Sequence, residues 1–134
     1  MLFDIKQGIL YSVIPDENQT EIILPNEVET VWFDAFESCT NVESIVINCG
    51  AKCIKGGAFL ECTSLKKIYI PQSVKKIHVF DDNYIFYNQM MKSKGGYSEF
   101  RNASSELVVI GEKGSLAEEY CAHFEIPFKT DETS

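Results

Sequence analysis

Ile22-Ile23-Leu24-Pro25 recurs along the chain as Ile45-Val46-Ile47-Asn48 and as Ile68-Tyr69-Ile70-Pro71, with a step of 23 residues each time. A fixed step of this length, at which apolar positions are kept while the residues between them vary, is typical of a solenoid. One coil of a solenoid cannot bury its own apolar face, so the coils are expected to stack on one another. The same step relates further sets of mostly apolar residues: Val28, Ala51 and Val74; Val31, Ile54 and Ile77; Ala35-Phe36 and Ala58-Phe59; Cys39 and Cys62; Val42 and Leu65.

Each recurring strand is expected to present one apolar side chain outward. Successive side chains of a strand point to opposite faces, so Ile22 is predicted to point inward and Ile23 outward. The outward positions of the next two coils hold Val46 and Tyr69, and Lys67 lies on the same strand as Tyr69. An exposed apolar ladder of this kind indicates a binding surface. In the alternative, the irregular segment after the repeats or a second copy of the chain covers it.

Each coil is predicted to continue with a second extended piece and a turn. The second pieces are expected over residues 28–31, 51–54 and 74–77, followed by a helical or 3₁₀ turn over 34–39 and 57–62. Phe36 and Phe59 are large side chains at equivalent positions of the two turns, and they are expected to fill the space between strand and turn. The strands of the coils are expected to form one parallel sheet.

The chain is long enough for one domain, residues 1–134, with several segments. Residues 1–20 are predicted to form an N-terminal hairpin cap around the tight turn Gln7-Gly8. Residues 21–80 hold the repeats and 81–104 an irregular insertion. Residues 105–128 form a C-terminal cap with a strand and a helix over 115–124, in which Ser115 and Glu118 make a capping box. Residues 129–134 are expected to be a frayed tail.

The third coil breaks the pattern. Asp81-Asp82-Asn83 stands where the repeat has Ala-Phe, and the pattern is expected to resume near Leu107. Residues 83–104 combine aromatic with basic residues, a composition that interfaces favour. Two interpretations stay open: the aromatic residues, Phe100 among them, cap the exposed edge of the third coil, or they bind a partner. The candidate binding residues in this insertion are Tyr84, Tyr87, Tyr97 and Arg101.

Residues 22–42 and 45–65 carry the nearly complete pattern I-x-I-P-x-x-V-x-x-I-x-x-x-A-F-x-x-C-x-x-L, and residues 68–77 carry its first half. In this pattern the chain resembles the BspA-like class of bacterial leucine-rich repeats. Residues 3–10 and 107–128 resemble the opening hairpin and the closing strand and helix of such arrays. Asn48, in place of the proline that ends the strand, departs from the pattern. The resemblance implies a right-handed, strand-dominated α/β leucine-rich-repeat solenoid, used for protein or surface adhesion, with no chemistry to inherit.

The net charge of −8 argues against binding of nucleic acid or of an anionic membrane surface. The charge is unevenly distributed, because residues 1–44 carry −8, residues 45–80 carry +5 and residues 81–134 carry −5. The basic region is either a solvated surface without a role or a stripe that orients an acidic partner. The lysines of this stripe are Lys52, Lys55, Lys66, Lys67, Lys75 and Lys76.

The location of the protein is expected to be cytoplasmic, because the N-terminus lacks the features of a signal peptide. A secreted or cell-surface protein whose leader was removed is the alternative. No apolar run approaches the roughly 18 residues that a membrane span needs. Five cysteines are an odd number, which does not imply a disulfide framework, and Cys39 and Cys62 are expected to stack as buried, reduced thiols.

No motif predicts catalysis, a cofactor or a metal. His78 and His123 are the two histidines, and neither lies beside a serine or cysteine at the spacing of a nucleophile and its base. We therefore expect a non-enzymatic module that binds a partner protein through the strand face and residues 83–104. The alternative is a structural, self-associating module, a homodimer without a separate ligand.

Overall fold

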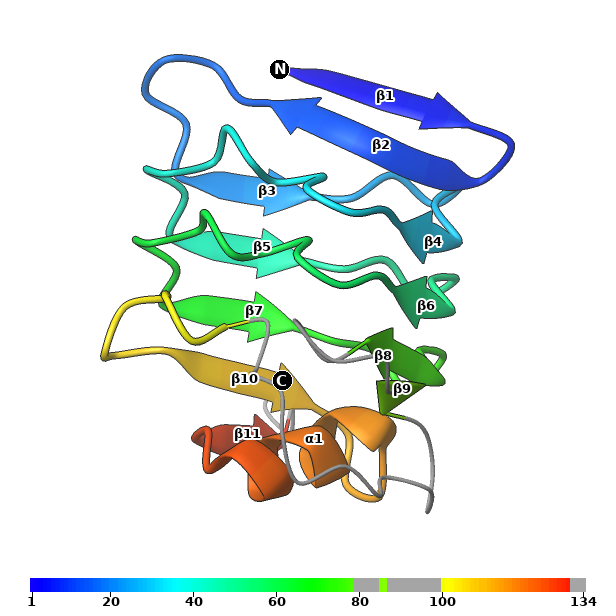
Figure 1. The fold of residues 1–134 in the computed structure, drawn as a ribbon, viewed down its shortest axis with the longest axis vertical. Helices are drawn as coiled ribbons and strands as arrows, with labels where there is room; N and C mark the ends of the chain where they lie inside the picture. The colour runs from blue at the N-terminus through cyan, green and yellow to red at the C-terminus, as the bar shows by residue number, and fades with distance from the viewer. Residues whose placement is uncertain (79–84, 87–99, 131–134) are drawn as a thin grey trace.

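The computed structural model describes residues 1–78, 85–86 and 100–130, which form a stack of coils about 23 residues apart (Figure 1). The stack begins with the predicted antiparallel hairpin of β1 (Leu2–Lys6) and β2 (Ile9–Ile14). Gln7 and Gly8 connect the two strands with φ of 51° and 80°, the left-handed conformation that a tight hairpin turn requires. The expected N-terminal hairpin cap is therefore confirmed.

The first strands of the coils form a five-stranded parallel sheet. It contains β3 (Glu21–Ile23), β5 (Ser44–Val46), β7 (Lys67–Tyr69), β10 (Val108–Gly111) and β11 (Phe128–Thr130). Ile22 pairs with Ile45, Ile45 with Ile68, and Ile68 with Val109, so the inward side chains lie in one buried row. This register confirms the alternation predicted from the sequence.

The second extended pieces form another sheet, so the expectation of one sheet is wrong. β4 (Thr30–Val31), β6 (Cys53–Ile54) and β8 (Lys76–His78) pair in parallel, with β2 before β4 and β9 (Ile85–Phe86) antiparallel to β8. The physical reason is the repeat itself. Each coil is displaced from the last by one strand spacing, so every extended piece meets its own copy at hydrogen-bonding distance. The five-stranded and six-stranded sheets thus form two sides of the stack (Figure 1).

The interior between the sheets holds a column of aromatic rings. Phe36 and Phe59 are buried and stack with ring centroids 4.9 Å apart, which is close to the spacing of adjacent strands. The turns that carry these rings are held by bonds between residues three apart, such as Glu37 N–H to Asp34 O at 3.0 Å. These turns form no regular helix, and their bonds are of the predicted 3₁₀ type.

Phe100 takes the position in the third coil that Phe36 and Phe59 hold in the first two coils, since the third coil has no Ala-Phe of its own. Its ring is 5.2 Å from that of Phe59 and 6.3 Å from that of Tyr120 in the C-terminal helix. The offset between paired strands rises from 23 residues for Ile45 and Ile68 to 41 for Ile68 and Val109, and Phe100 lies 41 residues after Phe59. The repeat therefore resumes at Phe100 and not near Leu107. Residues 100–104 belong to the coil, whereas the sequence assigned them to the insertion.

Asn48, where the pattern has proline, joins two coils. Its side-chain amide is buried and donates hydrogen bonds to the carbonyl oxygens of Val28 (2.7 Å) and Asn26 (3.3 Å) in the preceding coil. One coil further, the Ser73 hydroxyl donates to the carbonyl of Ala51 at 2.6 Å, and Ala51 is the counterpart of Val28. The second coil thus uses a polar side chain to satisfy a backbone group that would otherwise be buried without a partner.

The C-terminal cap has the predicted order of strand and helix. Helix α1 spans Leu116–Phe124, and the Ser115 side chain accepts a hydrogen bond from the backbone N–H of Glu118 at 3.3 Å. The second bond of the capping box differs, since the Glu118 carboxylate accepts from Gly114 N–H at 2.7 Å. Lys129 and Thr130, expected in a frayed tail, instead pair with β10 as part of β11. The remaining residues of that expected tail, 131–134, lie outside the described residues.

Candidate functional site

The outer face of the five-stranded sheet carries the apolar ladder predicted from the repeat. Ile23 pairs with Val46 and Val46 with Tyr69, so the three side chains lie in one row across β3, β5 and β7. The side chain of Ile23 is 60% exposed, whereas Val46 and Tyr69 are half-buried. The structure adds Ile110 of β10, which pairs with Tyr69 and is also half-buried.

Lys67 lies in the neighbouring row of the same face. It pairs with Ser44 on one side and with Val108 on the other, and Glu21 of β3 begins the row. Lys67 and Glu21 are both exposed, so one ammonium group and one carboxylate border the apolar ladder in this row. The row therefore places a polar rim beside an apolar centre, the usual arrangement of an interface.

A pocket of about 390 Å³ opens beside the ladder, where β7 ends. Tyr69 lines it together with Cys49, Pro71 and Glu112, which come from the loops that follow three successive strands of the sheet. Tyr69 thus belongs to both the ladder and the pocket wall. A pocket of this size at the side of an apolar row could receive one large side chain of a partner.

Of the four candidate binding residues in the insertion, the structure describes Arg101. Tyr84, Tyr87 and Tyr97 lie outside the described residues. Arg101 is exposed on the turn that follows Phe100, and it has an interaction within the chain. Phe100 is buried, 5% exposed, and contributes to the core. For Phe100 the capping interpretation is correct.

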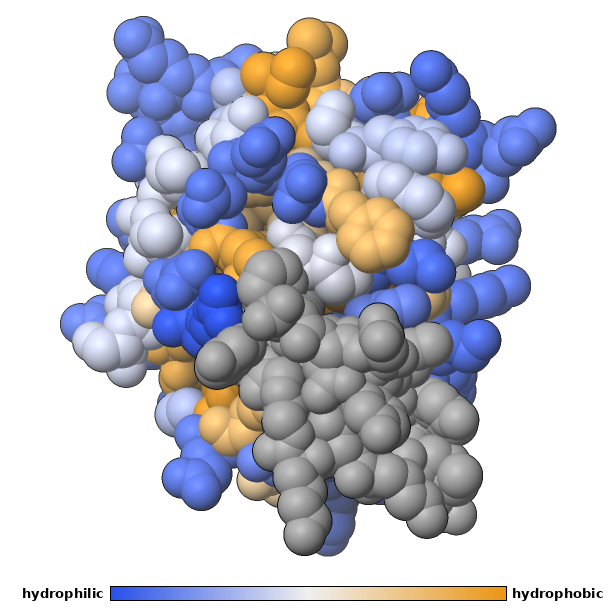
Figure 2. Space-filling model, in the orientation of Figure 1, coloured by the Kyte–Doolittle hydropathy of each residue, from blue (hydrophilic) through white to orange (hydrophobic). Residues whose placement is uncertain are grey.

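The six-stranded sheet carries a basic pocket on its own outer face, of about 350 Å³. Of the described residues, its walls hold four of the six lysines of the predicted stripe and no acidic residue. Hydrophilic side chains project along this side of the molecule, next to β4 and β6, in the space-filling view (Figure 2). The residues that line the pocket are Lys52, Cys53, Lys55, Lys75, Lys76 and His78.

Burial and the nearby ammonium groups of Lys55 and Lys76 shift the pKa values of two groups in this pocket. Burial lowers the pKa of His78, and these two ammonium groups lower it further. Burial also raises the pKa of the Cys53 thiol, and the same two lysines oppose this shift. Lys55 and Lys76 thus act electrostatically on both His78 and Cys53, which line the same pocket.

Aromatic side chains adjoin the basic pocket toward the N-terminal end. Trp32 lies with its ring centroid 5.6 Å from that of Tyr11 and 5.1 Å from that of Phe33. The Lys55 ammonium lies 5.6 Å from the centroid of the Trp32 ring, which is a cation–π contact. Phe33 is 46% exposed. The 23-residue step relates Trp32 to Lys55 and His78, whereas Tyr11 and Phe33, which complete the aromatic cluster, lie outside that step.

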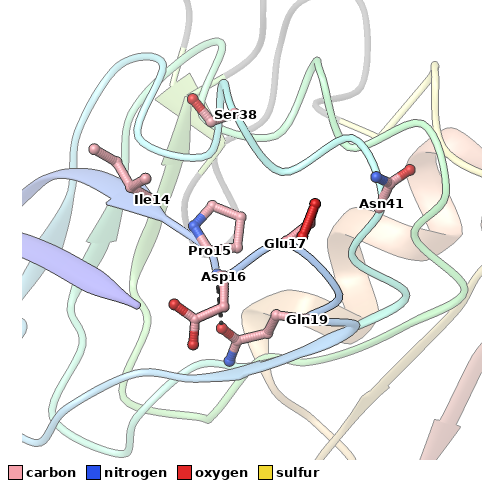
Figure 3. Close-up of a pocket in the computed structure, with 7 residues that line it drawn as sticks. All are labelled: Ile14, Pro15, Asp16, Glu17, Gln19, Ser38 and Asn41. Atoms are coloured by element: carbon pink, nitrogen blue, oxygen red, sulfur yellow. Dashed lines mark hydrogen bonds between the residues drawn. The ribbon is translucent and has the colours of Figure 1, made fainter.

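A third depression, of about 190 Å³, lies where the hairpin leads into β3 (Figure 3). Asp16, Glu17 and Gln19 come from the polar turn, and Ser38 and Asn41 come from the turn of the next coil. The backbone N–H of Asp16 donates to Oε1 of Gln19 at 3.2 Å, so the turn is bonded to itself. The depression is small and its polar groups have a structural role.

Within the part of the chain that the structure describes, no three His, Cys, Asp or Glu side chains are grouped so that they could hold a metal ion. Among the same residues, no helix has the length and apolar character needed to cross a membrane. All five cysteines are described, and each is a free thiol, with Cys39, Cys62 and Cys121 buried.

Comparison with known proteins agrees with the architecture. The family described as "BspA type Leucine rich repeat region (6 copies)" matches residues 9–106, which is most of the chain. No curated protein and no solved structure gives a match. The matched residues contain the hairpin's second strand, the strands from β3 to β9 and the aromatic column up to Phe100. On its repeat pattern, its stacked coils and this match, the chain belongs to the BspA-type leucine-rich repeat family.

Proposed function

We propose that this protein is a non-catalytic module that binds a partner protein through the outer face of its five-stranded sheet. Leucine-rich repeats of this family are generally interaction scaffolds without catalytic activity. The observation that carries the proposal is the ladder of Ile23, Val46, Tyr69 and Ile110, four apolar side chains in register on an outer face. Water contact with such a row is unfavourable, and burial by a partner removes it.

The pocket beside Tyr69 is a second reason to propose the outer face of the five-stranded sheet as the binding site. A partner side chain seated there would lie against an aromatic ring and Pro71. Lys67, in the row beside the ladder, would favour an acidic neighbour on the partner. An aromatic anchor in a pocket, surrounded by weaker contacts, is the usual energetic pattern of an interface. We propose that residues 83–99, including Tyr84, Tyr87 and Tyr97, and the exposed Arg101 add to this interface. We propose, in keeping with the expected location of the chain, that the partner is a cytoplasmic protein.

The experiment compares partner capture by two variants with the same added charge. Ile23→Lys places an ammonium in the ladder, whereas Thr40→Lys places one on an exposed turn of the same coil. Both should leave the melting temperature unchanged, because both positions are exposed. Tagged protein of each kind is incubated with extract of the source organism, and the captured proteins are quantified by mass spectrometry.

We expect a protein that the wild type and Thr40→Lys recover equally and that Ile23→Lys loses. Equal recovery with all three proteins would refute the strand face as the site. Replacement of residues 92–99 by a short Gly-Ser linker, which spares Phe100, tests the contribution of the insertion in the same assay.

The same variants also decide whether the chain instead associates with itself. A dimer found by light scattering of the purified wild type, and dissociated by Ile23→Lys but not by Thr40→Lys, would identify the chain as the occupant of its own ladder. That result would replace partner binding by the structural, self-associating function.

A further inference from the structure

The outer face of the six-stranded sheet has its polar and aromatic groups arranged in columns along the stack. Thr30, Cys53 and Lys76 face outward in one column, because each pairs with the next. The neighbouring column continues from Trp32 through Lys55 to His78, since Lys55 N–H donates to the carbonyl of Val31 at 2.9 Å and keeps the same register. Side chains of one column are separated by about 4.8 Å, the spacing of adjacent strands.

Along the second column the chemistry changes from aromatic to basic. Tyr11, Trp32 and Phe33 form the aromatic end, and Phe33 is 46% exposed. Lys55 joins the two ends, because its ammonium lies over the Trp32 ring and also lines the basic pocket. The other lysines of the pocket surround the far end. The face therefore has an apolar contact at one end and a concentration of positive charge at the other.

Among the described residues, few carboxylates lie near the lysines of this pocket. Lys52 has a carboxylate near it, that of Glu29 at 3.8 Å, and both groups are well exposed. Across residues 1–78, 85–86 and 100–130, no carboxylate lies within ion-pair distance of Lys55, Lys75 or Lys76. Lysines brought together in this way repel one another, and a bound anion removes that repulsion. His78 and Cys53, which are both half-buried, line the pocket beside these lysines.

We propose that this face is a second binding site, distinct from the ladder, for an extended acidic peptide segment that carries an aromatic or large apolar residue next to its carboxylates. The apolar residue would pack on Trp32 and Phe33, and the carboxylates would lie in the lysine pocket. The distance from Trp32 to the level of His78 is two strand spacings, about 10 Å. An extended chain advances about 3.3 Å per residue, so the acidic residues would be about two to three positions from the aromatic one.

A peptide is the occupant that fits both halves of this face. Inorganic phosphate or another small anion would use the lysines and leave the aromatic cluster without a contact. The net charge of −8 disfavours nucleic acid as a ligand. An acidic peptide with one aromatic residue satisfies the charge and the apolar surface together.

The test measures fluorescence polarisation of labelled synthetic peptides with the intact chain at low salt. Two peptides carry one Phe separated by two serines from three Glu, one in each chain direction, because the polarity of binding is open. A third has Gln in place of Glu, and a fourth has Ser in place of Phe. Pyrophosphate is the small-anion probe, added as a competitor.

Two charge-matched variants locate the site. Lys55→Gln/Lys76→Gln removes two charges from the pocket, and Lys6→Gln/Lys113→Gln removes two from exposed positions elsewhere. If each pocket ion pair contributes about 0.5–1 kcal/mol, the pocket variant should bind about five- to thirtyfold more weakly. The control variant should bind like the wild type. Phe33→Ser should weaken binding of the Phe-containing peptide but not of the peptide with Ser in its place.

Saturable binding of at least one Phe–Glu peptide, weakened by Gln for Glu, by Ser for Phe and by the pocket variant, would support the proposal. Binding that is absent at millimolar peptide, or equal in the two charge-matched variants, would overturn it. If pyrophosphate displaces the peptide with Ser in place of Phe as well as it displaces a Phe-containing peptide, and Phe33→Ser has no effect, the face is a small-anion site instead. Self-association that only Lys55→Gln/Lys76→Gln abolishes would assign the face to the acidic first coil of a second copy. These outcomes do not depend on the Ile23→Lys experiment, so either binding site can be refuted without affecting the proposal for the other.

Discussion

Replacement of Phe100 by alanine tests whether the third coil is completed by a residue from beyond the insertion. The ring is 5% exposed and lies between Phe59 at 5.2 Å and Tyr120 at 6.3 Å. Removal of a buried phenylalanine side chain costs about 3–5 kcal/mol, because its transfer free energy is lost and a cavity remains. Two aromatic contacts, each contributing about 0.5–1.5 kcal/mol, are part of this loss.

We expect about 3–4 kcal/mol for Phe100→Ala, in the lower part of the range because the ring is not fully enclosed. This is a large share of the stability of a single domain. The assay is urea denaturation followed by circular dichroism, with the slope of the transition compared between variants. Phe59→Ala, in the centre of the column, is the benchmark at about 3–5 kcal/mol. Ser105→Ala, an exposed neighbour, is the control and should lie within about 0.5 kcal/mol of the wild type.

Phe100→Leu should recover roughly half of the loss, because it refills much of the volume but restores no ring contact. If Phe100→Ala costs less than about 1 kcal/mol while Phe59→Ala costs the expected amount, the placement of Phe100 in the column is wrong. The segment around it would then be a dispensable part of the insertion.

Three further predictions concern buried polar groups and thiols. Asn48→Ala should cost about 1–3 kcal/mol in urea denaturation, because the Val28 carbonyl loses its hydrogen-bond donor. Asn48→Asp should cost more, because it places a carboxylate against the carbonyl oxygens of Val28 and Asn26. Equal stability of Asn48→Ala and the wild type would contradict the role given to this side chain. Burial raises the pKa of Cys39 from 9.0 to about 11, so the thiol ionises at lower pH in the unfolded chain than in the folded one. The free energy of unfolding should therefore decrease as pH rises from about 9 to about 11, by about 1.4 kcal/mol per pH unit for this thiol. Cys39→Ala should show a smaller slope, and a stability that does not depend on pH over this interval would count against the burial of the thiol. Cys39 and Cys62 should be reduced in protein purified without reductant, as measured by intact mass before and after reduction, and a difference of two hydrogens assigned to this pair would favour an oxidising compartment over the cytoplasm.

The 23-residue step was sufficient to predict how the coils stack. A strand in each coil must pair with its copy, so the inward row of Ile22, Ile45 and Ile68 and the outward ladder both follow from the spacing of apolar residues. The terminal caps were also predictable, because a tight turn at Gln7-Gly8 and an N-cap at Ser115 are local signals. The second sheet follows from the same repeat, although the prediction of one sheet overlooked it.

The contacts made by the residues that follow the insertion could not be predicted from the sequence and are known only from the tertiary structure. The offset between paired strands increases by 18 residues across it, from 23 to 41, and no local pattern announces that Phe100 continues the column or that Ile110 extends the ladder. Loop closure costs little more as a loop lengthens, so the length of the insertion does not determine which residue enters the next coil. Asn48 shows the same limit, since its partners at Val28 and Asn26 belong to another coil. A period determines the spacing of the coils, whereas the packing of side chains between them determines which residue fills a position where the period fails.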